Sequence, residues 1–111
     1  MRRIHNLPDY FDFLATVIIH APDRFPSEDF LPPEEQLNLE RAFSELRDGM
    51  EFISQRITAS SALSVLGQLL DDSLAAYRLG DAKKGARLLQ DFEEIAFRPE
   101  LASLDTAGRK R

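Results

Sequence analysis

Two histidines and three acidic pairs are the residues of this 111-residue chain that come nearest to catalytic chemistry. His5 and His20 flank one apolar segment, and no second ligand set accompanies them, so we expect capping or surface histidines. The pairs Glu34-Glu35, Asp71-Asp72 and Glu93-Glu94 consist of neighbours, which point in different directions on a helix and do not chelate an ion by themselves. These residues therefore predict no metal site and no cofactor.

Other catalytic signatures are also missing from the sequence. The chain has no cysteine, which excludes a thiol nucleophile, a disulfide and a Cys-ligated metal. Gly80 and Gly85 are isolated and form no phosphate-binding loop, and Ser60, Ser61 and Ser64 have no histidine in sequence reach. We expect a protein that is not an enzyme.

The best candidate for binding chemistry is an acidic, proline-punctuated segment that precedes the longest periodic stretch. Aromatic anchors ringed by acidic charge provide both a desolvated contact and electrostatic steering of a basic partner. The alternative is a solvated loop packed on the helices. The candidate partner-binding residues are Asp23, Phe25, Glu28, Asp29, Phe30, Glu34 and Glu35.

The charge distribution restricts the class of partner. The net charge is −5, yet five of the fourteen basic residues lie at the two ends, so residues 4–108 hold nine basic and nineteen acidic residues. Such a body repels phosphate backbones and attracts basic proteins, which argues against nucleic-acid binding. No segment approaches the ~18 apolar residues of a membrane helix, and no signal-peptide pattern is present, so we expect a cytoplasmic protein with no membrane partner.

The first periodic segment predicts a helix over residues 8–20, with Asn6 as its cap. Phe13 and Ile19 make this helix apolar nearly all round, so it is either central in the bundle or exposes a contact surface, including one for a homodimer. Four prolines make residues 21–33 a loop.

A heptad seam predicts one long helix over residues 34–57, with a break at Asp48-Gly49 as the alternative. The seam consists of Leu39, Phe43, Leu46, Met50, Ile53 and Ile57. A third helix follows a cap at Thr58 or Ser60 and ends at Gly80. Asp81 caps a fourth helix that ends before Pro99.

Together these elements predict an all-α fold, an antiparallel four-helix bundle built from helical hairpins. Residues 1–99 form the single domain, because a chain this short supports one core. Residues 100–111 lose the periodicity, finish in Gly-Arg-Lys-Arg and are expected to form a flexible basic tail.

In size, acidity and helical layout the chain resembles small all-helical bacterial immunity proteins, which neutralise interbacterial toxins. The local similarity runs from Arg24-Phe25-Pro26 through Glu35-Gln36-Leu37 into the long helix. The resemblance implies a cognate toxin, often cationic, whose active or entry site is blocked by tight binding. Two alternatives stay open: a small acidic secretion chaperone or adaptor that uses the face of Phe13 and Ile19, and a helical regulatory domain with an internal pocket.

Overall fold

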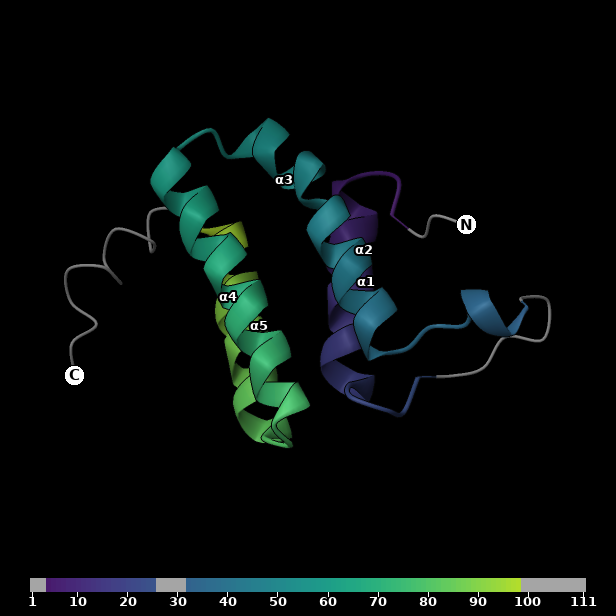
Figure 1. The fold of residues 1–111 in the computed structure, drawn as a ribbon. Helices are drawn as coiled ribbons and strands as arrows, with labels where there is room; N and C mark the ends of the chain where they lie inside the picture. Colours follow the sequence, from purple (N-terminus) through teal and green to yellow (C-terminus); the bar gives the residue numbers. More distant parts are fainter. Residues whose placement is uncertain (1–3, 26–31, 99–111) are drawn as a thin grey trace.

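The computed structural model describes residues 4–25 and 32–98 as an all-helical bundle (Figure 1), which confirms the predicted class. No strand occurs in these ranges. The elements are α1 (Leu7–His20), the 3-10 turn η1 (Pro33–Glu35), α2 (Leu39–Asp48), α3 (Met50–Arg56), α4 (Ser60–Arg78) and α5 (Ala82–Phe97). The predicted tail, residues 100–111, lies outside the described part.

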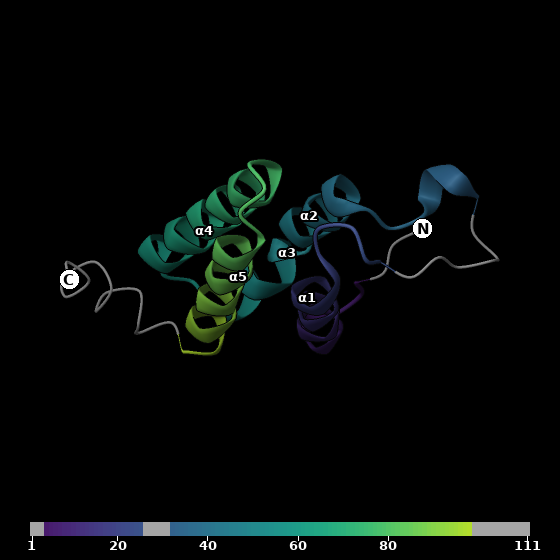
Figure 2. The same cartoon turned by 90° about the horizontal axis from the view of Figure 1, so that it is seen from below.

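Two helical pairs make up the bundle. Helices α4 and α5 lie side by side as a hairpin, and α1 lies beside α2, while α3 crosses one end from α2 toward α4 (Figure 1). Seen along the bundle, α2 lies next to α4 and α1 next to α5 (Figure 2). The core therefore lies between the two pairs, and one face of α2 remains outside.

Helix ends were the most predictable local features. Asn6 accepts a hydrogen bond from the Asp9 amide at 2.8 Å, and Asp81 accepts one from the Lys84 amide at 3.2 Å. Gly80 has φ +88°, the left-handed conformation that ends a helix without the penalty of a Cβ. The cap expected at Thr58 or Ser60 is wrong: α4 starts at Ser60 behind Ala59, which has no side-chain cap bond.

The heptad seam identifies the core correctly. Its members Phe43, Leu46, Ile53 and Ile57 are buried, while Leu39 and Met50 are partly buried. Phe13 is also a core residue, only 7% exposed, so it is not part of an exposed apolar face. Ile19 is 72% exposed, although its neighbours Val17 and Ile18 are buried in or packed against the core.

The single long helix over residues 34–57 is wrong, and the alternative break at Asp48-Gly49 is right. Glu34 belongs to η1, α2 begins only at Leu39, and a new helix, α3, begins at Met50. The break lies at Gly49, which has φ −72° and ψ −8°, values that any residue can adopt. Glycine is therefore not required here for backbone conformation.

Gly49 is required because the ring of Tyr10 occupies the space of a side chain. A Cβ at Gly49 would lie 2.8 and 2.9 Å from two Tyr10 ring carbons, closer than van der Waals contact allows. The ring is fully buried and stacks on Phe92 at a centroid distance of 6.0 Å, and its hydroxyl donates to the Leu46 carbonyl at 2.7 Å. That carbonyl lies in the last turn of α2, where helix ends leave acceptors without partners.

A second close approach holds the α4–α5 hairpin together. A Cβ at Gly85 would lie 2.7 Å from the Tyr77 ring, and the buried Ser73 hydroxyl donates to the Gly85 carbonyl at 2.7 Å. The Tyr77 ring also meets Phe43 edge-on at 6.0 Å. Within the described residues the buried Tyr77 hydroxyl has no hydrogen-bond partner, and burial raises its pKa. The Tyr77 ring therefore stabilises this packing, whereas its buried hydroxyl lowers the stability of the fold.

We predict that Gly49→Ala lowers the free energy of unfolding by about 1–3 kcal/mol, the usual cost of overpacking a fixed core. Gly67→Ala in α4 is the matched control, because a Cβ there meets nothing within 4 Å. The control should gain roughly 0.5–1 kcal/mol through helix propensity. Urea denaturation measures both, and equal effects would contradict the packing role of Gly49.

We predict that replacing each buried tyrosine with phenylalanine changes the stability in opposite directions. Tyr10→Phe should cost about 1–2 kcal/mol of stability, because it leaves the Leu46 carbonyl without the hydroxyl donor in a buried place. Tyr77→Phe should add about 1 kcal/mol, because it removes a buried hydroxyl that has no partner. Thermal unfolding of both variants is the measurement, and a loss of stability in both would refute this assignment.

Candidate functional site

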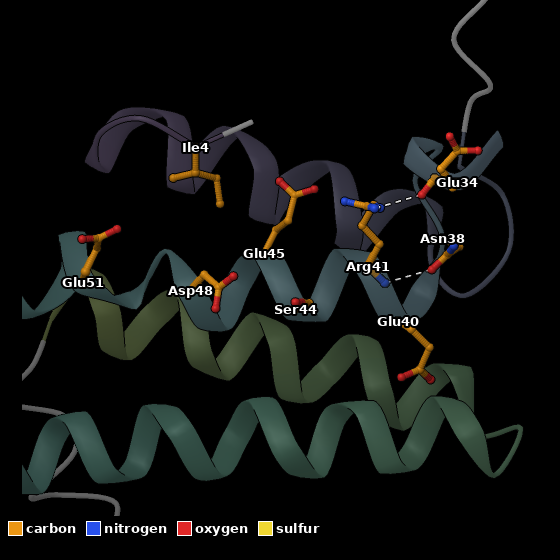
Figure 3. Close-up of a pocket in the computed structure, with 9 residues that line it drawn as sticks. All are labelled: Ile4, Glu34, Asn38, Glu40, Arg41, Ser44, Glu45, Asp48 and Glu51. Atoms are coloured by element: carbon orange, nitrogen blue, oxygen red, sulfur yellow. Dashed lines mark hydrogen bonds between the residues drawn. The ribbon is translucent and has the colours of Figure 1, made fainter. Parts of the chain in front are cut away.

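An open groove of about 900 Å³ runs along the outer face of α2, from η1 to the start of α3 (Figure 3). It is lined by Ile4, Glu34, Asn38, Glu40, Arg41, Ser44, Glu45, Asp48 and Glu51. Five of these side chains are carboxylic acids and one is basic. The groove is therefore a strongly acidic surface, and we name it the α2 groove.

Short local interactions position the side chains of the α2 groove. The Asn38 side chain caps α2 by accepting from the Arg41 amide at 2.8 Å, and the Arg41 guanidinium donates to the Glu34 carbonyl at 2.9 Å. Arg41 thus ties η1 to the first turn of α2, as the dashed lines in Figure 3 show. Ile4 is buried and closes the side of the groove next to α1. These bonds hold η1 and the first turn of α2 together, and with them the end of the groove that contains Glu34.

Glu40 lies at the end of the α2 groove that faces the other helical pair. Arg78 donates two hydrogen bonds to the Glu40 carboxylate, one from Nε to Oε2 at 2.9 Å and one from Nη2 to Oε1. This ion pair joins α2 to the end of α4. The hydrogen bonds from Arg78 hold the pKa of the Glu40 carboxyl below its ordinary value. A parallel ion pair between Arg47 and Asp71 joins the same two helices.

The structure brings only part of the predicted acidic surface to this groove. Glu34 is exposed and lines it. Asp23 is exposed just after α1, and Phe25 is half-buried against the core, with its ring 6.4 Å from that of His20, but neither lines the groove. Glu28, Asp29 and Phe30 lie outside the described residues, as does the side chain of Glu35.

Sequence reasoning missed most of the acidic groove residues, namely Glu40, Glu45, Asp48 and Glu51. They lie on the polar side of the heptad seam, which is the ordinary solvated side of an amphipathic helix. A signal existed in the spacing, because Glu45 and Asp48 are three residues apart and share one face of α2. What the spacing did not reveal is that η1 and Ile4 wall this face into a groove.

Some of the residues considered for catalysis take part in structural interactions. His20 Nδ1 lies 2.9 Å from the Thr16 carbonyl oxygen, and the His5 amide donates to the Asp9 carboxylate at 3.1 Å. Asp71 pairs with Arg47. In residues 4–25 and 32–98 no group of three or more histidine, aspartate or glutamate side chains is arranged to hold a metal ion.

Comparison with known proteins adds no assignment. The chain matches no protein-family model, no curated protein and no solved structure. None of the described helices combines the length and the apolar character needed to cross a membrane. The site must therefore be interpreted from its own chemistry.

We predict that Arg78→Gln raises the pKa of Glu40 toward the ordinary glutamate value of roughly 4.3. Because the folded-state pKa is lowered, the ion pair contributes to stability above the unfolded-state pKa and is lost as pH falls through the folded-state pKa. An NMR pH titration of the Glu40 carboxyl carbon measures this. Arg47→Gln, which breaks the other α2–α4 ion pair, should leave the Glu40 titration unchanged; an ordinary Glu40 pKa in the unaltered protein would contradict the pairing.

Proposed function

We propose that this chain is a non-catalytic protein-binding domain that docks a basic protein on the α2 groove. The main support for the proposal is that one groove gathers five carboxylic side chains and one guanidinium, from η1, α2 and the start of α3. Such a surface attracts a cationic partner over a distance and orients it before contact. The acidic balance of residues 4–108 extends the same attraction around the groove.

The shape of the groove favours a protein segment over a small ligand. Small-molecule sites are mostly apolar concavities that enclose their ligand, with a few convergent polar groups. The α2 groove is open along its length, and polar side chains make up nearly all of its lining. Lysine and arginine side chains of a partner can enter it from solvent and pair with carboxylates without burying a charge deeply.

The finer proposal is an immunity or inhibitor protein that neutralises a cognate bacterial toxin in the cytoplasm. The resemblance to small helical immunity proteins supports it, and so does the acidic groove, since a cationic toxin is the partner that the resemblance implies. Binding would block the active or entry site of the toxin sterically, so the inhibitor needs no chemistry of its own. The acidic groove extends the candidate surface from Glu34 onto α2.

A secretion chaperone or adaptor is the second candidate, because Ile19 leaves an apolar side chain 72% exposed at the end of α1. Phe13 no longer supports it, because that ring is buried in the core. A homodimer through α1 depends on the same exposed residue. The two functions differ in the surface used: α2 for the inhibitor and α1 for the chaperone.

The first experiment identifies the partner. The full chain carrying an N-terminal tag is recovered from its native cells, and the proteins that co-purify in equal amounts are identified by mass spectrometry. A single basic protein whose toxicity is abolished at one equivalent of this chain supports the inhibitor. A set of secreted substrates in place of one basic protein would overturn it in favour of the chaperone.

Charge reversal in the α2 groove should weaken binding of that partner mainly through the association rate. We predict that Glu34→Lys with Asp48→Lys lowers the association rate constant at low salt by about tenfold or more, and that the loss shrinks as salt rises. The matched control reverses two exposed acids outside the groove, Asp12→Lys with Glu94→Lys. Surface plasmon resonance at several salt concentrations compares them, and an equal loss in both pairs would show that only net charge matters.

A further inference from the structure

A second surface, at the tip of the α4–α5 hairpin, has the opposite charge. Lys83, Lys84 and Arg87 are exposed on the first turns of α5, and they border a shallow hollow with Asp81, Leu88 and Asp91. In the turn that precedes α5, Leu79 is 85% exposed, the most exposed large apolar side chain in residues 4–25 and 32–98.

The three cations have no acidic partner within the described part of the chain. Elsewhere on the bundle, Arg47 pairs with Asp71 and Arg78 pairs with Glu40. The nearest acid in sequence, Asp81, uses its carboxylate to accept the Lys84 amide as the cap of α5. Three cations against the two acids that border the hollow, Asp81 and Asp91, leave the tip with a net positive charge that an external anion can meet.

The tip is rigid. The Asp81 amide donates to the Ala76 carbonyl at 2.8 Å and the Gly80 amide to the Tyr77 carbonyl at 3.0 Å, the paired bonds of a Schellman helix end. The Ser73–Gly85 hydrogen bond fixes the start of α5 against α4 directly behind this turn. A rigid surface loses little conformational entropy when it binds, which favours recognition.

We propose that the hairpin tip, defined by Leu79, Lys83, Lys84 and Arg87, docks a short acidic protein segment that carries an apolar residue. Carboxylates of the segment pair with the three cations, and its apolar side chain covers Leu79. The tip shares no residue with the α2 groove, although the Arg78–Glu40 ion pair lies between them, and the inference does not depend on the function proposed for that groove.

The charge of the whole chain selects a short acidic segment over an extended polyanion. A nucleic acid or an anionic membrane presents negative charge over a wide area and would also meet the body, where residues 4–108 hold nineteen acidic and nine basic residues. At physiological salt charges are screened beyond about 8 Å, so a segment of a few residues at the tip meets mainly the cations there.

The test is a titration of the full ¹⁵N-labelled chain with the fluorescein-labelled peptide Glu-Glu-Leu-Asp-Glu-Leu, followed by NMR and fluorescence anisotropy. We expect saturable amide shifts confined to residues 79–91. A peptide with glutamine and asparagine in place of the acids should leave these amides unshifted. Shifts centred elsewhere, or none at millimolar acidic peptide, would overturn the proposal.

Variants separate the two parts of the surface. Lys83→Glu with Lys84→Glu should weaken peptide binding by about tenfold or more, since two of three cations reverse sign. Leu79→Ser should weaken it several-fold, while Arg56→Glu, an exposed cation on α3, should change it less than about twofold. Equal weakening by Arg56→Glu, or tighter binding of phosphatidylserine vesicles or of a thymidine 20-mer than of the peptide, would refute an acidic protein segment as the occupant.

Discussion

The contact between the Tyr10 ring and the backbone at Gly49 is the constraint on which the rest of the bundle depends. It joins three helices at one point: the ring comes from α1, its hydroxyl bonds to the Leu46 carbonyl of α2, and its face stacks on Phe92 of α5. The close approach is possible only because position 49 lacks a side chain. Close-packed interiors leave no room to relieve such a contact, so residue 49 fixes where α2 ends and α3 turns across the bundle.

The two charged surfaces follow from this arrangement. Because α2 ends at Asp48, its outer face is short, and η1 and Ile4 wall it at the sides. Because α3 carries the chain across to α4, the α4–α5 hairpin lies beside the α1–α2 pair. The tip of the hairpin lies away from the break at Gly49 (Figure 1). An acidic groove and a basic, apolar tip thus occupy different places on one small domain.

Sequence reasoning succeeded where local chemistry decides the structure and failed where a distant residue does. The cap at Asn6 and the turn at Gly80 depend on neighbouring residues, so both were predictable. The heptad seam gave the correct core but continued through Gly49, because nothing near that glycine in sequence points to Tyr10. For Phe13 the sequence left a central and an exposed position open, because periodicity alone does not tell which neighbouring helices cover a residue, and the structure buries it. At the site, Glu34 was identified from the sequence. The acids of α2 were not, because their spacing is that of an ordinary solvated helix face and the sequence does not show that η1 and Ile4 border this face.

The claim that matters most is that a basic protein covers the outer face of α2. Amide hydrogen exchange of the full chain, with and without the basic protein that co-purifies with it, tests this directly, because covered amides exchange more slowly. Added protection is expected to be greatest over residues 34–51, while the exposed face of α4 stays unchanged. Protection that omits residues 34–51 and falls on the last turn of α1 around Ile19 would contradict it.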